Sequence, residues 1–373
     1  MSLVIDIHAL HTLPPSLINR DDTGAPKSAI FGGVPRQRVS SQAWKRAMRK
    51  YFGEHFGEEL VGTRSTRMPE VIATRAVELN PELDIQTAIE GATSLFKAAK
   101  IGIQNPQKPK KNEEKEVYPY PTTKYLIFLS PAQIERAAQV IAQGEATAIK
   151  KAEATQILDT EHSVDIAAFG RMVADNAMFN VDASIQVAHA LGVHESSSEF
   201  DYFTAVDDAV EAAEETGAAM LGTVQFTSST LYRFATINVD GLAENLGSKE
   251  AAVTTASQLV DAFISSMPTG KINTFANQTL PELVYITIRN DRSVSLINAF
   301  ESPVEATDGK SRRQVAAQRL AAESTAIEEA YGLKPTAAFA VALGDLVEPF
   351  QEIATLTTMT ELGSQIESAL QGA

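Results

Sequence analysis

Strand-like patterns near both ends of this 373-residue chain enclose a long, mainly helical stretch. Residues 3–10 alternate so that Leu3, Ile5, Ile7 and Ala9 share one face, which predicts a strand. Further strands are expected at 219–227, 230–239 and 284–289, with a helix over 249–266 between the last two. Strands and helices in this order favour an open antiparallel α+β sheet over alternating parallel units.

The middle of the chain, from about residue 57 to residue 161, is expected to be mostly helical, for example over 134–142. Residues 105–116 interrupt it with two prolines and charges of both signs, which predicts an exposed linker. Residues 124–129 are strongly apolar and predict a buried strand within the helical region.

Positive charge is concentrated near the N-terminus, although the chain has a formal net charge of −15. Between Thr23 and Phe52 there is no acidic residue, and the basic residues are Lys27, Arg36, Arg38, Lys45, Arg46, Arg49 and Lys50. We call these seven residues the basic stripe. Such a stripe suits a polyanion, because each neutralised phosphate releases condensed counterions. On charge alone, a solvated basic helix remains the alternative.

A helix is predicted within the stripe, with Ser40 or Ser41 as its N-cap. Helical spacing places Trp44, Ala47, Met48 and Tyr51 on one face, and Gln42, Lys45, Arg46 and Arg49 on the other. Long cations would then lie just beyond a helix N-terminus, whose free N–H groups also favour phosphate. Upstream, Gly32 and Gly33 predict a tight turn at which backbone can approach a ligand closely.

The stretch from Asn19 to Arg49 resembles the N-terminal region of the CasC-type backbone subunit of the type I-E CRISPR Cascade complex, in the RAMP superfamily. The resemblance extends from residue 4 to about residue 305 and is weaker around 60–160 and in the C-terminal tail. Its further blocks are Gly170–Met172, Val187–Ala190, Asp201–Asp208, Thr223–Asn238 and Leu296–Glu301.

The resemblance implies an α+β fold with an RNA-recognition-motif-like (ferredoxin-like) palm, a helical fingers insertion and a thumb hairpin. The palm would comprise residues 1–58, 186–198 and 230–373, the last range including C-terminal helices. The fingers would comprise residues 59–185, and the thumb residues 199–229.

The resemblance also implies a site for RNA. Phosphates and 2′-hydroxyls would be held by Arg20, Lys27, Ser40, Gln42, Lys45 and Arg49, and the stripe itself suggests adding Arg38 and Arg46. Backbone contacts of this kind position a strand without selecting its sequence. Met172 and Phe203 would be apolar wedges beside a displaced base, with Tyr202 as stacking support. Without the motif context, Met172 and Phe203 would be assigned to a core.

The implied function is non-catalytic. Several copies would assemble along the spacer of a CRISPR guide RNA, beside other Cascade subunits, and would meet target DNA through the guide. No cofactor or metal is expected. One alternative is a RAMP-superfamily endoribonuclease acting on CRISPR RNA or target RNA. Another, from a different class, is an acidic metabolic enzyme whose basic helix binds a phosphorylated metabolite.

Three other groups of residues could suggest catalytic or metal sites. His8 and His11 would project to opposite faces of a strand, which argues against a metal pair. His189 is expected to be a structural histidine in a helix of small residues. Asp207 and Asp208 could suggest a nuclease, but no histidine lies near them in the sequence, so an acidic turn or cap is preferred.

The remaining composition points to a cytoplasmic protein without membrane contacts. The chain has no cysteine, which excludes disulfides and thiolate metal sites. Its first residues lack the basic and apolar regions of a secretory signal. The apolar run 337–343 is too short to span a bilayer.

Overall fold

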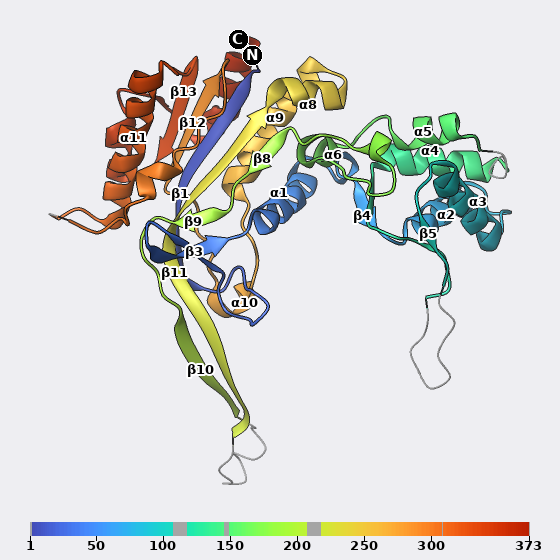
Figure 1. Ribbon diagram of the computed structural model, residues 1–373, viewed down its shortest axis with the longest axis horizontal. Helices are drawn as coiled ribbons and strands as arrows, with labels where there is room; N and C mark the ends of the chain where they lie inside the picture. The colour runs from blue at the N-terminus through green and yellow to red at the C-terminus, as the bar shows by residue number, and fades with distance from the viewer. Residues whose placement is uncertain (1, 107–117, 145–148, 207–217, 308, 373) are drawn as a thin grey trace. The chain divides into compact units, whose positions relative to one another are not determined.

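The computed structural model describes residues 2–106, 118–144, 149–206, 218–307 and 309–372 (Figure 1). The chain divides into two compact units, which we name the sheet unit and the helical unit. The sheet unit comprises Met1–Tyr51, Gln186–Val239 and Ala256–Ala373. The helical unit comprises Phe52–Ile185 and Asp240–Thr255. The predicted fingers range, 59–185, falls within the helical unit, which also contains 240–255.

The sheet unit is built on one large sheet, in the order β14-β13-β12-β1-β11-β9-β3-β2, with β8 and β10 also paired to β11. The strand pairs whose register is described are antiparallel, except that β13 and β14 are parallel. The predicted α+β class is therefore confirmed. The strands are β1 (Val4–Ser16), β2 (Ser28–Phe31), β3 (Val34–Val39), β8 (Ile185–Val187), β9 (Ala190–Gly192), β10 (Glu199–Val206), β11 (Ala218–Asn238), β12 (Leu283–Arg289), β13 (Ala337–Ala342) and β14 (Thr355–Leu356).

The centre of this sheet has the strand order of a βαββαβ arrangement. Its strands lie in the order β12-β1-β11-β9, with α1 (Ser41–Phe56) following β1 in the chain and α9 (Lys249–Ser265) joining β11 to β12. Both helices cover one face, where the Arg233 guanidinium lies 3.7 Å from the ring centroid of Trp44 and 4.4 Å from that of Phe263. This packing fixes the start of α1 against the middle of the sheet.

The other face of the sheet is covered by α11 (Arg312–Tyr331) and the short helix η4 (Ile297–Phe300). Tyr285 and Ser324 on α11 are joined by a hydrogen bond of 3.2 Å between their hydroxyls. The Tyr232 ring packs on Phe300 with centroids 5.3 Å apart. Both tyrosines are fully buried. The remaining helices of this unit are α10 (Ile272–Phe275), η5 (Gly344–Phe350) and α12 (Met359–Gln371).

β11 is a single long strand where the sequence predicted two, at 219–227 and 230–239. Its C-terminal part pairs with β1 from Val4↔Asn238 to Leu13↔Ser229. The register then shifts, and one further pair forms at Ser16↔Thr227. Within this strand, the Thr230 hydroxyl lies 2.9 Å from the hydroxyl of Thr12 on β1. The predicted separation into two strands is therefore wrong.

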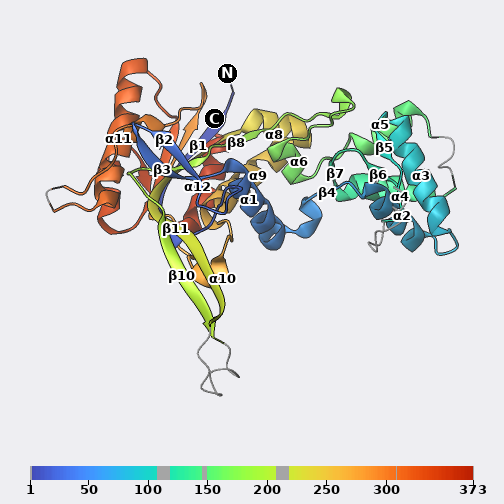
Figure 2. The same cartoon turned by 60° about the horizontal axis from the view of Figure 1, so that its bottom comes forward.

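The N-terminal part of β11 leaves the sheet and pairs with β10, from Glu199↔Phe226 to Val206↔Ala218. This two-stranded ribbon projects from the sheet (Figures 1 and 2). The pairing of β1 with β11 is irregular at Pro14 and Pro15, which lack the N–H needed for a ladder, and its last pair is Ser16↔Thr227. The residues that join β10 to β11, including Asp207 and Asp208, lie outside the described residues.

The helical unit has a core of its own, formed mainly by α2, α3, α4 and α5 around Ile72, Leu95, Phe96 and Ile141. The predicted strand at 124–129 is shorter, because only Ile127–Leu129 forms β7 while Lys124, Tyr125 and Leu126 are exposed. Most of the predicted linker at 105–116 lies outside the described residues. The elements are η1 (Glu58–Leu60), β4 (Thr63–Ser65), α2 (Met68–Leu79), α3 (Ile85–Ala98), β5 (Ile103–Gln104), β6 (Thr122–Thr123), β7, α4 (Pro131–Ala142), α5 (Lys151–Leu158), α6 (Val164–Phe169), η3 (Ala177–Phe179) and most of α8 (Val239–Leu246).

His8 and His11 point to opposite faces of β1, as predicted. His8 stacks on Phe234 and Tyr285, and its Nδ1 lies 2.8 Å from the Tyr232 hydroxyl. His11 lies on the α1 side, where its Nε2 is 3.0 Å from the Thr279 carbonyl oxygen. Burial lowers the pKa of each histidine to about 3, with a smaller effect from a nearby arginine.

We expect these two histidines to make the protein less stable as the pH falls from 6.5 towards 3. Over that range the unfolded chain binds protons that the folded state does not, so the free energy of unfolding drops by roughly 1 kcal/mol per pH unit for each histidine. Urea unfolding at several pH values measures this. His8→Gln should reduce the slope. An unchanged slope in His8→Gln would show that His8 titrates normally in the fold.

Candidate nucleic-acid interface

Backbone hydrogen bonds bring the first predicted RNA-binding residues together around Asn19. The Asn19 side-chain oxygen accepts the Ser40 N–H at 2.9 Å, and its carbonyl oxygen accepts the Lys27 N–H at 3.1 Å. The Lys27 carbonyl oxygen in turn accepts the Arg38 N–H at 2.9 Å. Lys27, Arg38 and Ser40 thus lie in one network at the start of α1. Arg20, which is exposed, pairs with Pro26 in the same loop.

The start of α1 confirms the predicted beginning of the helix and its two predicted faces. Ser40 precedes the first helical residue, and its carbonyl oxygen accepts the N–H groups of Ala43 and Trp44 at 3.0 and 3.3 Å. Ser40 is nearly buried, so it contributes little surface of its own. The apolar face is buried at Trp44 and Met48. On the opposite face Gln42 and Arg46 are exposed, and Lys45 and Arg49 are half-buried.

Burial lowers the pKa of Lys45 on α1. The cause is desolvation of the ammonium group by the surrounding helix and sheet residues. A phosphate placed beside Lys45 would offset that cost, because a nearby opposite charge favours the charged form. Lys45 is therefore suited to binding an anion rather than to remaining solvated.

Arg38 contacts His189, which the sequence analysis assigned to a helix and not to the RNA site. Its Nη1 lies 3.2 Å from Nδ1 of His189, and its Nε donates to the Ser28 carbonyl oxygen at 3.3 Å. His189 is exposed and lies between β8 and β9, so the predicted helix of small residues is wrong here. Partial burial, followed by the charges of Arg38 and Lys27, lowers the pKa of His189. A neutral His189 can accept from Arg38 and extends the polar surface beside Lys27.

Arg36 belongs to the basic stripe in sequence, but its side chain is fully buried and is not part of the exposed surface. Its guanidinium donates to four carbonyl oxygens, those of Phe31, Gly192, Phe300 and Glu301, at 3.0–3.2 Å. Gly32 and Gly33, both with positive φ, turn β2 into β3 as predicted. At Gly32 a Cβ would collide with the Glu301 carbonyl oxygen, so this glycine serves packing. A Cβ at Gly33 would have nothing within 4 Å, and a ligand contact there stays a prediction.

Phe203 lies on the ribbon that projects from the sheet unit. It pairs with Gly222, and its ring covers that glycine so closely that a Cβ there would lie 2.4 Å from the ring edge. Neighbouring Phe200 and Tyr202 lie on the opposite face of the ribbon and are about two-thirds exposed. Phe203 is thus held flat on the ribbon with its outer side accessible, and it is not a core residue.

Met172 belongs to the helical unit, and the Gly170–Met172 motif explains why its side chain is exposed. Gly170 has φ 78° and leaves no room for a Cβ beside the Val181 carbonyl oxygen. Arg171 turns inward, is buried, and pairs with Asp159 at 2.6 Å. Met172 then points outward and is 79% exposed. The alternative assignment of Met172 to a core is therefore wrong.

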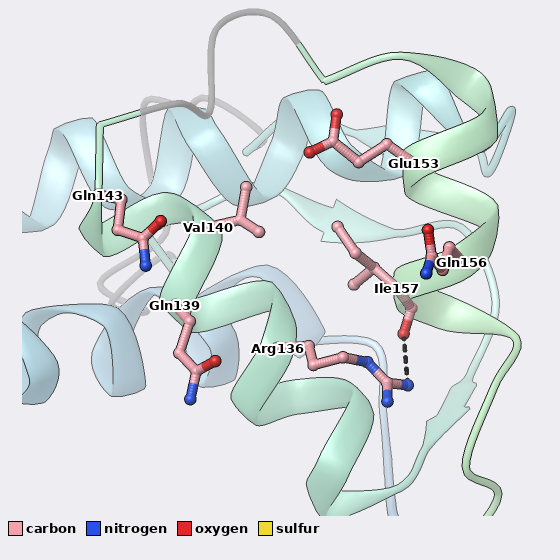
Figure 3. A pocket seen from close by; sticks show the side chains of 7 residues that line it. All are labelled: Arg136, Gln139, Val140, Gln143, Glu153, Gln156 and Ile157. Atoms are coloured by element: carbon pink, nitrogen blue, oxygen red, sulfur yellow. Dashed lines mark hydrogen bonds between the residues drawn. The ribbon is translucent and has the colours of Figure 1, made fainter.

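An open pocket of about 310 Å³ lies between α4 and α5 of the helical unit (Figure 3). Glutamines dominate its polar lining, together with Glu153 and Arg136. The Arg136 guanidinium already donates to the carbonyl oxygens of Ile157 and Thr160, at 3.2 and 2.7 Å, and pairs with Glu161. A single carboxylate and an occupied guanidinium do not form the acid–base pair that catalysis would need.

Among the described residues, no group of three or more histidine, aspartate or glutamate side chains is placed to hold a metal ion. No helix in the part of the chain that the structure describes has both the length and the apolar character needed to cross a membrane.

Comparison with known proteins places the chain in a family. The model of the family described as CT1975-like protein matches residues 5–367. The chain belongs to the CT1975-like protein family. No protein in the curated set matches it.

Two solved structures resemble this CT1975-like protein over nearly their whole length. One chain, from a structure titled "CRISPR RNA-guided surveillance complex, pre-nicking", is 31% identical with a TM-score of 0.83. The match covers 98% of our chain and 100% of that chain. Another, from a structure titled "CRISPR RNA-guided surveillance complex", is 27% identical with a TM-score of 0.73, over 99% and 100%.

Proposed function

We propose that this CT1975-like protein is a non-catalytic, RNA-binding backbone subunit of a CRISPR RNA-guided surveillance complex, of the CasC type found in type I-E Cascade. The observation that carries the proposal is the match of the whole chain to a subunit of such a complex at 31% identity. Its partners would be the guide RNA, neighbouring copies of itself, other Cascade subunits and, through the guide, target DNA. A cytoplasmic location remains a prediction.

The polar surface at the start of α1 supports binding to the RNA backbone. Its side chains are cations, an amide and a histidine, from Lys27, Arg38, Gln42, Lys45, Arg46, Arg49 and His189. These groups contact phosphates and 2′-hydroxyls without distinguishing bases, which suits a subunit that must hold any guide sequence. Base pairing between guide and target would then supply the specificity.

The burial of the sheet restricts where RNA can bind. RNA-recognition motifs commonly stack bases on aromatic side chains of the exposed sheet face. Here His8, Tyr232 and Tyr285 on that face are buried beneath η4 and α11. In the proposed complex, RNA would instead contact the loops and α1 at the end of β3, the ribbon formed by β10 and β11, and Met172.

The proposal is tested by mixing the purified protein with a CRISPR guide RNA and measuring the mass of the complex. We expect several copies on one RNA. After addition of complementary DNA and Mg²⁺, both strands should remain intact. RNA cleavage that is lost in Asp207→Ala or Asp208→Ala would instead support the endoribonuclease alternative. A protein that binds a phosphorylated metabolite but never assembles on RNA would support the metabolic enzyme.

A further inference from the structure

The segment that joins α9 to β12 carries the short helix α10 between two residues in the left-handed conformation. Lys271, just before α10, has φ 50° and ψ 26°, and Ala276, just after it, has φ 47° and ψ 36°. Both residues have a side chain, so this conformation costs free energy that glycine would not lose. Strained backbone of this kind is found most often where a segment presents a group to a ligand.

Contacts on two sides hold this segment within the sheet unit. A Cβ at Gly270 would lie 2.4 Å from the Ile18 carbonyl oxygen, so the chain before α10 packs on the backbone two residues ahead of Arg20. At the end of α10, the Phe275 ring packs on Phe226 with centroids 6.0 Å apart. Phe226 belongs to the first pair of the ribbon. α10 therefore lies between the loop that carries Arg20 and the base of the ribbon (Figures 1 and 2).

Lys271 is the one charged residue between positions 262 and 281 of the sequence. Its side chain is exposed, as is that of Asn273 on α10. No carboxylate among the described residues forms an ion pair with Lys271, although Glu199 begins the ribbon nearby. In a chain of net charge −15, an exposed and unpaired lysine in a segment without acids favours an anionic ligand.

The position of α10 identifies which anion would bind there. The RNA surface that we propose has two parts in the sheet unit, the cations around the start of α1 and the ribbon, and α10 lies between them. The exposed side chains on α10 are polar, those of Asn273 and Thr274. A protein partner would be expected to bury aromatic or apolar side chains at the centre of its contact, whereas amide and hydroxyl groups beside an ammonium suit the phosphates and sugars of a nucleic acid.

We propose that Lys271 binds a phosphate of the RNA strand between the nucleotides held at α1 and those held at the ribbon. Asn273 and Thr274 would donate hydrogen bonds to the same stretch of backbone. The inference rests on the proposed function, because it adds a contact for the same RNA. It also explains why a lysine occupies a left-handed position that suits glycine, since glycine would supply no charge.

The test uses the left-handed conformation itself to separate charge from fold. Lys271→Gly removes the ammonium group and suits the local φ, and Ala276→Gly is the matched control at the other end of α10. Fluorescence anisotropy with the full chain and an unstructured RNA, at several salt concentrations, measures binding. Lys271→Gly should weaken it about tenfold at low salt and lower the slope of log affinity against log salt by about one. Ala276→Gly should change neither, and Lys271→Arg should retain both.

A second measurement locates the contact on the RNA. Guide RNAs in which one phosphate at a time is replaced by an uncharged methylphosphonate are bound to the wild-type protein and to Lys271→Gly. The phosphate that Lys271 binds is one whose replacement weakens binding of the wild-type protein but not of the variant. We expect it to lie between the phosphates that respond in this way to Lys45→Gln and the base displaced at the ribbon.

The outcomes distinguish this inference from the proposed function. If Lys271→Gly binds RNA with wild-type affinity and salt slope, the inference is wrong and the proposed function stands. If Ala276→Gly weakens binding equally, the conformation of the segment and not the charge is responsible, and the inference is wrong. If Lys271→Gly loses only the association between copies, Lys271 contacts protein and the inference is again wrong. If the wild-type protein does not bind guide RNA, the proposed function fails and this inference fails with it.

Discussion

Reversing the charge of Lys45 and Arg49 together is expected to weaken RNA binding on the order of 100-fold at low salt, for unrelated RNA sequences alike. Both side chains lie on the face of α1 opposite the buried Trp44 and Met48. Loss of two phosphate contacts should also lower the slope of log affinity against log salt by about two. Fluorescence anisotropy with unstructured RNAs at several salt concentrations measures both quantities.

A matched control separates local contacts from overall charge. Lys249→Glu with Lys334→Glu makes the same change in net charge at two exposed lysines outside the basic stripe. It should affect binding only slightly. Because Lys45 is half-buried, Lys45→Gln with Arg49→Gln should accompany the reversal, and melting temperatures should show that each variant is folded. Unchanged affinity at moderate salt would mean that the basic face of α1 is merely solvated.

Shortening the ribbon is expected to abolish cooperative assembly on RNA while leaving a folded protein. Tyr202 and Thr223 are directly paired across β10 and β11, so residues 203–222 can be replaced by Asn-Gly, which closes a two-residue hairpin. Thr227 and Ser229 are retained, because they are buried where β11 pairs with β1. Mass measurement should then show weak, non-cooperative binding through Lys45 and Arg49, without a regular footprint in chemical probing.

A milder variant tests the role of the ribbon side chains. Phe203→Ala together with Met172→Ala should preserve assembly and cost about 1–3 kcal/mol for each stacked base that is lost. If the shortened protein still assembled with the same regular footprint, the ribbon would not be the thumb, and the role assigned to Phe203 would be wrong.

The sequence predicted those features that depend on regular spacing. The faces of α1 follow from the period of Trp44 and Met48 against Gln42 and Arg46, and the opposite directions of His8 and His11 follow from the period of a strand. Arg36 could not be distinguished from Arg38 in this way. Its four carbonyl acceptors come from β2, β9 and the region of η4, so its burial depends on tertiary contacts.

Two further errors have similar causes. The predicted gap between residues 227 and 230 is wrong, because pairing with β1 continues through Ser229 and Thr227. His189 was assigned to a helix because its neighbours are small, but Leu191 and Gly192 pair with β11. The signal that could have linked His189 to the site was its place in the Val187–Ala190 block, although nothing in the sequence identified Arg38 as its partner.

The continuity of β11 has a mechanical consequence. One uninterrupted strand belongs both to the central sheet and to the ribbon, so the described part of the arm has no hinge at its base. From Ala218 to Phe226 it extends about 30 Å at the usual rise of a strand. The arm can therefore act as a ruler whose length and inclination are set by backbone pairing. In the assembly that we propose, substitutions along the arm would change what it binds, while the step between successive copies would remain the same.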